Sequence, residues 1–211
     1  MAALSLPNVG YATNADHGMG CTIHPAAKQY VSERLANAAL AIQYKKDLAW
    51  KSPTFRSSSA SSADGNPVSE SVSMSVTFND VGASGLELLH PFNYKSPSYG
   101  AATNPPVIID CTATFPCGPA QNCSMAAQCA WASLQLADGS WVNATISVSG
   151  AAANAITLTA DGAALSDEAL AGPALGSSYG YGPIPMLSVY DKATGLPVLP
   201  WNTTAQPGFS A

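Results

Sequence analysis

Residues 71–78 alternate strictly between small polar side chains and larger apolar ones, the apolar positions being Val72, Met74, Val76 and Phe78. A repeat of two residues is the pattern of a β-strand with one buried face and one face in water. The same pattern recurs more weakly at residues 142–148 and 156–158. Short segments rich in Asp, Asn, Gly and Pro predict tight turns next to these expected strands, at residues 64–67, 138–139 and 161–162. Antiparallel β-structure, most simply a β-sandwich, is therefore expected over most of the chain after residue 46.

A helical repeat precedes the strands. Apolar residues recur at spacings of three and four after Pro25, at Val31, Leu35, Ala38, Ala39 and Ile42. This spacing predicts an amphipathic helix with Arg34 on its solvent-facing side. Pro25 suits the first helical position, because its missing N–H costs nothing there and its fixed φ already fits. The helix and the strands together predict a mixed α+β fold.

His24 directly precedes the expected start of this helix. A ring in this position can point into a cleft and take a proton from a nucleophile, as a general base does. The same ring can instead cap the helix or pack beneath it, which is the ordinary role of a single histidine before a helix. The residue alone does not separate these two interpretations.

The residues around His24 form a block, Ile23-His24-Pro25-(x)2-Lys28-Gln29-(x)1-Val31-(x)2-Arg34-Leu35-Ala36. This block resembles the one that carries the catalytic histidine in the sialate O-acetylesterase family, serine esterases with an SGNH-type α/β catalytic domain. Residues 52–55 and 76–82 resemble the start of the β-rich module that follows that domain. Residues 181–183, 187–190 and 195–203 resemble the family's closing signature, a Tyr-rich strand followed by a Gly-Leu-Pro turn.

The resemblance implies two units. Residues 1–46 would be the C-terminal strand and helix of the SGNH-type α/β hydrolase domain, and residues 47–211 an antiparallel β-sandwich accessory module. The implied activity is carbohydrate O-acetylesterase, a serine carboxylic-ester hydrolase that removes acetyl groups from sugars without a cofactor. In that chemistry His24 would be the general base.

The nucleophile of this family lies in a Gly-x-Ser type block well upstream of the histidine. Ser5 is the serine that precedes His24, and its neighbours form no Gly-rich turn. We therefore expect the remainder of the catalytic domain upstream, and no activity from this chain alone. Met1 would then be an internal methionine, a mis-called start or the start of a truncated paralogue.

A serine esterase also needs a carboxylate that orients the histidine. SGNH enzymes often place it three residues before the histidine, where this chain has Cys21. Asp16 is the carboxylate upstream of His24, and Asp16-His17-Gly18 resembles an Asp-x-Gly found before the histidine in many relatives. Asp16 is therefore either the triad carboxylate or an ordinary turn residue.

Cysteines and glycosylation sequons favour an oxidising compartment. Four cysteines at six-residue spacing, Cys111, Cys117, Cys123 and Cys129, suit two local disulfides. They lack the paired C-x2-C spacing of a zinc site, so no metal is expected. The sequons lie at Asn122, Asn143 and Asn202. These features predict a secreted or lysosomal glycoprotein.

Composition limits the partners. The net charge of −5 and the absence of a basic cluster argue against nucleic acid, and no apolar run is long enough to span a membrane. An O-acetylated sugar or glycan is the expected substrate. Trp131 and Trp141 are predicted to be core residues, and Tyr181 and Trp201 to be exposed. The alternative to an esterase is a non-catalytic secreted β-sandwich that binds sugars or another protein.

Overall fold

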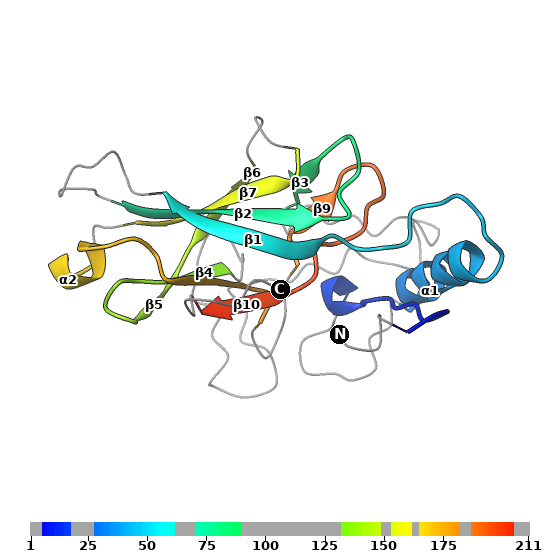
Figure 1. The fold of residues 1–211 in the computed structure, drawn as a ribbon, viewed down its shortest axis with the longest axis horizontal. Coiled ribbons are helices and arrows are strands. Elements are labelled where there is room, and N and C mark those ends of the chain that lie inside the picture. The colour runs from blue at the N-terminus through cyan, green and yellow to red at the C-terminus, as the bar shows by residue number, and fades with distance from the viewer. Residues whose placement is uncertain are drawn as a thin grey trace, which may run out of the picture.

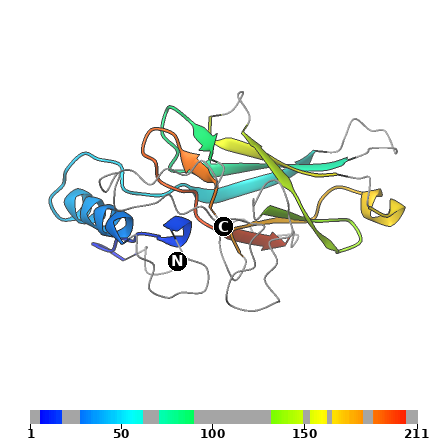
Figure 2. The ribbon, with the colours of Figure 1, turned by 180° about the vertical axis from the view of Figure 1, so that it is seen from behind.

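A computed structural model describes residues 6–17, 28–61, 71–89, 132–148, 153–161, 165–181 and 187–204. It is strand-rich, with antiparallel sheets and two α-helices that lie at opposite ends of the molecule (Figures 1 and 2). The mixed α+β prediction is therefore confirmed. His24, Cys21 and the four clustered cysteines lie outside the described residues.

Helix α1 (Gln29–Ile42) packs against the N-terminal segment, which ends in the short 3-10 helix η2 (Ala15–His17). The approach is close at Gly10, where a Cβ would lie 2.9 Å from the Ile42 side chain. The described part of helix α1 begins at Gln29, and its first hydrogen bond runs from the Ser32 N–H to the Lys28 carbonyl. Pro25 lies outside the described residues, so its place at the start of the helix stays a prediction.

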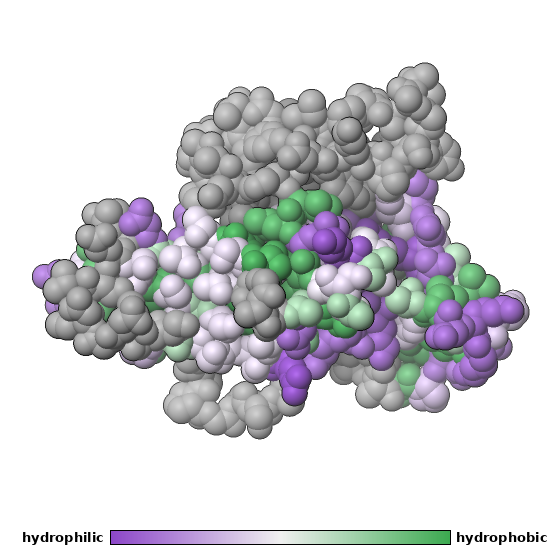
Figure 3. Space-filling model, turned by 90° about the horizontal axis from the view of Figure 1, so that it is seen from above, coloured by the Kyte–Doolittle hydropathy of each residue, from purple (hydrophilic) through white to green (hydrophobic). Residues whose placement is uncertain are grey.

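The buried face of α1 differs from the predicted one. Its buried residues are Tyr30, Arg34 and Ala38, whereas Leu35 is 50% exposed. The placement of Arg34 on the solvent side was therefore wrong, because an ion pair with the buried Asp16 carboxylate holds this side chain inside. At the end of the molecule that α1 occupies, hydrophobic and hydrophilic residues lie side by side at the surface (Figure 3).

The first sheet has the strand order β1-β2-β7-β6. Its members are β1 (Thr54–Ser61), β2 (Ser71–Asn79), β7 (Ala155–Asp161) and β6 (Thr145–Val148). All neighbours are antiparallel. In β2 the apolar positions are buried and the serines between them are half-buried, which confirms the predicted alternation.

The second sheet has the order β10-β8-β4-β5. Its members are β10 (Trp201–Thr204), β8 (Gly176–Tyr179), β4 (Ala132–Gln135) and β5 (Trp141–Asn143). The predicted single strand over residues 142–148 is therefore two strands. The chain leaves β5 at Ala144 and enters the first sheet as β6, so this short stretch connects both sheets.

Smaller elements complete the described fold. A two-stranded sheet joins β3 (Leu86–Leu88) to β9 (Val189–Asp191), and helix α2 (Asp167–Leu170) is capped by the Ser166 hydroxyl. The predicted turn at residues 138–139 is present between β4 and β5, with Gly139 at a φ of 84°. Hydrogen bonds from Ser140 to the Asp138 carboxylate close this turn and lower the pKa of Asp138.

An aromatic cluster in the core joins the two four-stranded sheets. Trp201 stacks on Tyr179 with ring centroids 4.8 Å apart and meets the edge of Phe78 at 5.3 Å. Its indole nitrogen donates a hydrogen bond to the Ser177 hydroxyl. Trp201 is therefore a core residue, and its predicted exposure was wrong, because strands distant in sequence surround it.

The other aromatic residues can also be compared with their predicted core or exposed positions. Trp141 is 42% exposed, so its predicted core position was wrong; it lies on β5, at the edge of the second sheet. Tyr181 is 67% exposed, as predicted. Trp131 lies outside the described residues. Among the helices that the structure describes, none combines the length and apolar character needed to cross a bilayer.

Candidate functional site

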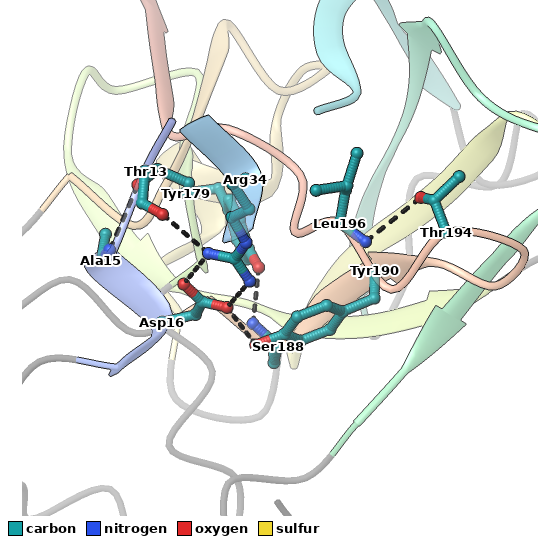
Figure 4. Close-up of polar contacts among 9 residues, drawn as sticks. All are labelled: Thr13, Ala15, Asp16, Arg34, Tyr179, Ser188, Tyr190, Thr194 and Leu196. Atoms are coloured by element: carbon teal, nitrogen blue, oxygen red, sulfur yellow. Dashed lines mark hydrogen bonds and ion pairs between the residues drawn. The ribbon is translucent and has the colours of Figure 1, made fainter. Parts of the chain in front are cut away.

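The Asp16 carboxylate is held in a buried, bidentate ion pair with Arg34 (Figure 4). Nη1 and Nη2 of the guanidinium each lie 2.7 Å from one carboxylate oxygen. The side chain of Asp16 is 0% exposed and that of Arg34 is 9% exposed. Two parallel charge-assisted hydrogen bonds of this kind fix orientation as well as distance.

Three parts of the chain meet at this pair. Asp16 comes from η2, Arg34 from α1, and Tyr190 of β9 donates a hydrogen bond of 3.3 Å to Oδ2 of Asp16. Arg34 also donates to the backbone carbonyl of Thr13 at 2.7 Å. The ion pair therefore joins α1 to the N-terminal segment, and the hydrogen bond from Tyr190 joins both to the β-structure.

This arrangement bears on the predicted role of Asp16. A carboxylate has about four lone-pair positions. Arg34 and Tyr190 together take both positions on Oδ2 and one on Oδ1, so the carboxylate is held in one orientation. Such a carboxylate is rigid enough to orient an imidazole, which is what a triad requires. His24 itself lies outside the described residues, so its pairing with Asp16 stays a prediction.

Tyr179 connects the site to the core of the β-structure. Its hydroxyl oxygen accepts hydrogen bonds from the backbone N–H groups of Ser188, at 2.6 Å, and Val189, at 2.9 Å. Burial of the phenol is the main cause that raises the pKa of Tyr179 to about 12, and the negative charge of Asp16 adds a smaller contribution. The segment that leads into Tyr190 is therefore tied to β8 by a buried side chain.

Replacing Tyr179 by phenylalanine is expected to lower the free energy of unfolding by about 2–4 kcal/mol near neutral pH, because two buried N–H groups lose their acceptor. The contribution of the Tyr179 phenol to the free energy of unfolding should also change with pH in the alkaline range. Since the pKa is raised from 10.0 to about 12 on folding, the stabilisation is complete below pH 10 and is lost as the pH rises toward 12. The stabilisation that this pKa difference contributes is about 3 kcal/mol. Urea unfolding measured at several pH values tests both parts.

Tyr181→Phe is the matched control, because this phenol is 67% exposed. It should unfold like the wild type at neutral pH. If Tyr179→Phe were as stable as the control and retained the alkaline loss, the buried hydroxyl would have no structural role.

Two members of the site were not identified as such in the sequence. Arg34 belongs to the block that resembles the esterase family, but the helical repeat placed it in solvent. Its alignment with Tyr30 and Ala38, each four residues away, is the signal that could have shown a buried face. Tyr190 lies in the closing block, and nothing in its local pattern points to Asp16, which lies 174 residues earlier.

The remaining predicted sites are described only in part. Asn143 and Asn202 are exposed, and Asn122 lies outside the described residues. The pairing of Cys111, Cys117, Cys123 and Cys129 stays a prediction, because all four lie outside them as well. Within the described ranges, no group of His, Cys, Asp and Glu side chains is arranged to hold a metal ion.

Comparison with known proteins shows a likeness in structure but not in sequence. No family model matches the chain, and no curated protein matches it in sequence. The chain superposes over 97% of its length on the carbohydrate acetylesterase XAC1771 from Xanthomonas citri, with a TM-score of 0.59 and 20% sequence identity. The chain shares its fold with part of a carbohydrate esterase. It spans about a third of that protein, 34% of its length.

Proposed function

We propose that this chain is part of a serine-type carbohydrate O-acetylesterase of the sialate O-acetylesterase kind. The observation that carries the proposal is the likeness to a carbohydrate acetylesterase over 97% of the chain. The order of the sequence blocks around His24, after residue 52 and near Trp201 independently suggests the same class of enzyme. The substrate would be an acetyl ester on a sugar.

In this proposal residues 1–46 belong to an SGNH-type catalytic domain and residues 47–211 form a β-sandwich accessory module. Two four-stranded antiparallel sheets that share one core support the second assignment. The nucleophilic serine would lie in the remainder of the catalytic domain. The clustered cysteines and the sequons support a secreted or lysosomal location.

His24 is proposed as the general base and Asp16 as the carboxylate that orients it. His24 would remove the proton of the serine hydroxyl as the serine oxygen attacks the acetyl carbonyl. The same proton would then pass to the departing sugar oxygen, leaving an acetyl-serine that water hydrolyses to acetate. The Asp16 carboxylate is buried and accepts two hydrogen bonds from Arg34. This fixed position supports its proposed role, because a fixed carboxylate can hold an imidazole in one tautomer.

The chain of 211 residues by itself is expected to hydrolyse p-nitrophenyl acetate no faster than the buffer, because a base without a nucleophile cannot start covalent catalysis. The measurement compares the wild-type chain with His24→Ala. A rate that His24→Ala abolished would place a nucleophile within these residues and contradict the proposed division of the enzyme.

The alternative is a non-catalytic secreted β-sandwich module that binds a sugar or a protein. One observation favours it: the carboxylate proposed for catalysis already makes an ion pair with Arg34. Such a pair suits a purely structural Asp16. A Gly-x-Ser block encoded immediately upstream in the verified transcript would decide for the esterase, and its absence would decide for the module.

A further inference from the structure

A surface cleft of about 310 Å³ lies where α1 is joined to the β-structure. Three segments line it: residues 48–51 after α1, residues 80–82 after β2, and Thr194 in the turn after β9. Its walls combine an indole, an ammonium, a carboxylate and a short apolar surface, from Trp50, Lys51, Asp80 and Val81. Asp16, the described member of the proposed esterase site, is not among the residues that line it.

The turn and the loop that line the cleft are fixed from behind by Asp191. This buried carboxylate accepts hydrogen bonds from the backbone N–H groups of Gly82 and Ala193. It accepts two more from the N–H and the hydroxyl of Thr194, each at 2.9 Å. The wall is therefore preorganised, which lowers the entropic cost of binding a ligand.

The indole of Trp50 is also held in place. Tyr11 meets it edge-on, with ring centroids 5.9 Å apart and an angle of 63° between the planes. The Tyr11 hydroxyl donates a hydrogen bond to the Ser52 carbonyl at 3.1 Å, which fixes Tyr11 in turn. A supported aromatic ring at the edge of a cleft presents a flat apolar surface.

The charged groups of the cleft are paired loosely. The Lys51 ammonium lies 4.0 Å from the Asp80 carboxylate and 5.6 Å from the centre of the Trp50 ring. The side chain of Lys51 is 53% exposed and that of Asp80 is 39% exposed, so this pair stabilises the fold little. Its contacts can be exchanged for contacts to a ligand. Because the two charges balance, the cleft has no net attraction for an anion.

We propose that this cleft binds a neutral pyranose unit of a glycan. The apolar face of the sugar ring would lie over Trp50 in place of the Lys51 ammonium, which would move aside and donate to one hydroxyl group. The neighbouring hydroxyl would donate to the Asp80 carboxylate. A flat ring surface with a few convergent polar groups is the general form of a small-ligand site.

The experiment is calorimetric titration of the 211-residue chain with xylohexaose and with cellohexaose, both neutral, and with 3′-sialyllactose as an acidic probe. We expect a neutral oligosaccharide to bind with a Kd on the order of 1 mM. Asp80→Asn and Lys51→Gln should each weaken binding about tenfold or more. Asp80 has a φ of 58°, a conformation that asparagine tolerates well, so Asp80→Asn keeps the loop intact.

Trp141→Ala is the control, because it removes an exposed indole outside the cleft and should leave binding unchanged. The proposal is overturned if neither neutral oligosaccharide binds, if only sialyllactose binds, or if Asp80→Asn and Lys51→Gln both bind as the wild type does. The titration requires no ester cleavage. An absence of binding would therefore not contradict the esterase proposal, and an absence of esterase activity would not contradict sugar binding in the cleft.

Discussion

Replacing His24 by alanine, in an enzyme where this chain is joined to its nucleophile-bearing segment, is expected to lower kcat by several orders of magnitude, about 10⁴–10⁶-fold. The reason is that the serine hydroxyl would lose the base that removes its proton. KM should change little, because the imidazole acts on the reacting atoms. Steady-state hydrolysis of an acetylated oligosaccharide measures both constants, and thermal unfolding checks that the variant folds.

Asp16→Asn should cost less than His24→Ala, since the carboxylate orients the base and does not itself take the proton. This variant also leaves the Arg34 guanidinium without its charged partner, so its activity has to be read beside its stability. Full activity in His24→Ala would remove the proposed mechanism altogether.

Replacing Arg34 by alanine is expected to lower the free energy of unfolding by about 3–5 kcal/mol, because it removes the guanidinium from a carboxylate that is 0% exposed. In a chain of this size the loss corresponds to a fall in Tm of roughly 6–20 °C. Urea and thermal unfolding of the two chains measure it directly.

Lys51→Ala is the matched control for charge removal. Its partner Asp80 lies 4.0 Å away and the two side chains are 53% and 39% exposed, so the change should cost no more than about 1 kcal/mol. A second variant, Arg34→Met with Asp16→Leu, removes both buried charges and should recover much of the loss. Equal effects from Arg34→Ala and Lys51→Ala would show that the buried pair contributes nothing special.

The strand pattern was predictable where one physical effect dominates. Residues 71–78 alternate because one face of β2 covers the core, and that burial is visible in any two-residue repeat. The run at 142–148 carries the same repeat, yet it divides at Ala144 between two sheets. A two-residue repeat indicates which face of a strand is buried. It does not indicate which sheet supplies the neighbouring strands.

The candidate site was less predictable, because its contacts are distant in sequence. The helical repeat located α1 but placed Arg34 in solvent, since periodicity ranks a charged residue as polar without knowing its partner. Trp201 was misplaced for a related reason: Pro- and Gly-rich neighbours suggest exposure, whereas Tyr179 and Phe78 enclose it. In both cases a single tertiary partner decided the outcome.

The hydrogen bond from Tyr190 to Asp16 joins residues that are 174 positions apart. On a ribosome that adds residues at its ordinary pace, Tyr190 is synthesised roughly 10–35 s after Asp16. Asp16 and Arg34 are made almost together and can pair early, whereas β9 emerges after most of the other described strands. If the two side chains pair in that interval, the pair faces water on the side that Tyr190 covers in the folded chain. The N-terminal segment therefore reaches its final attachment only after β9 has been synthesised.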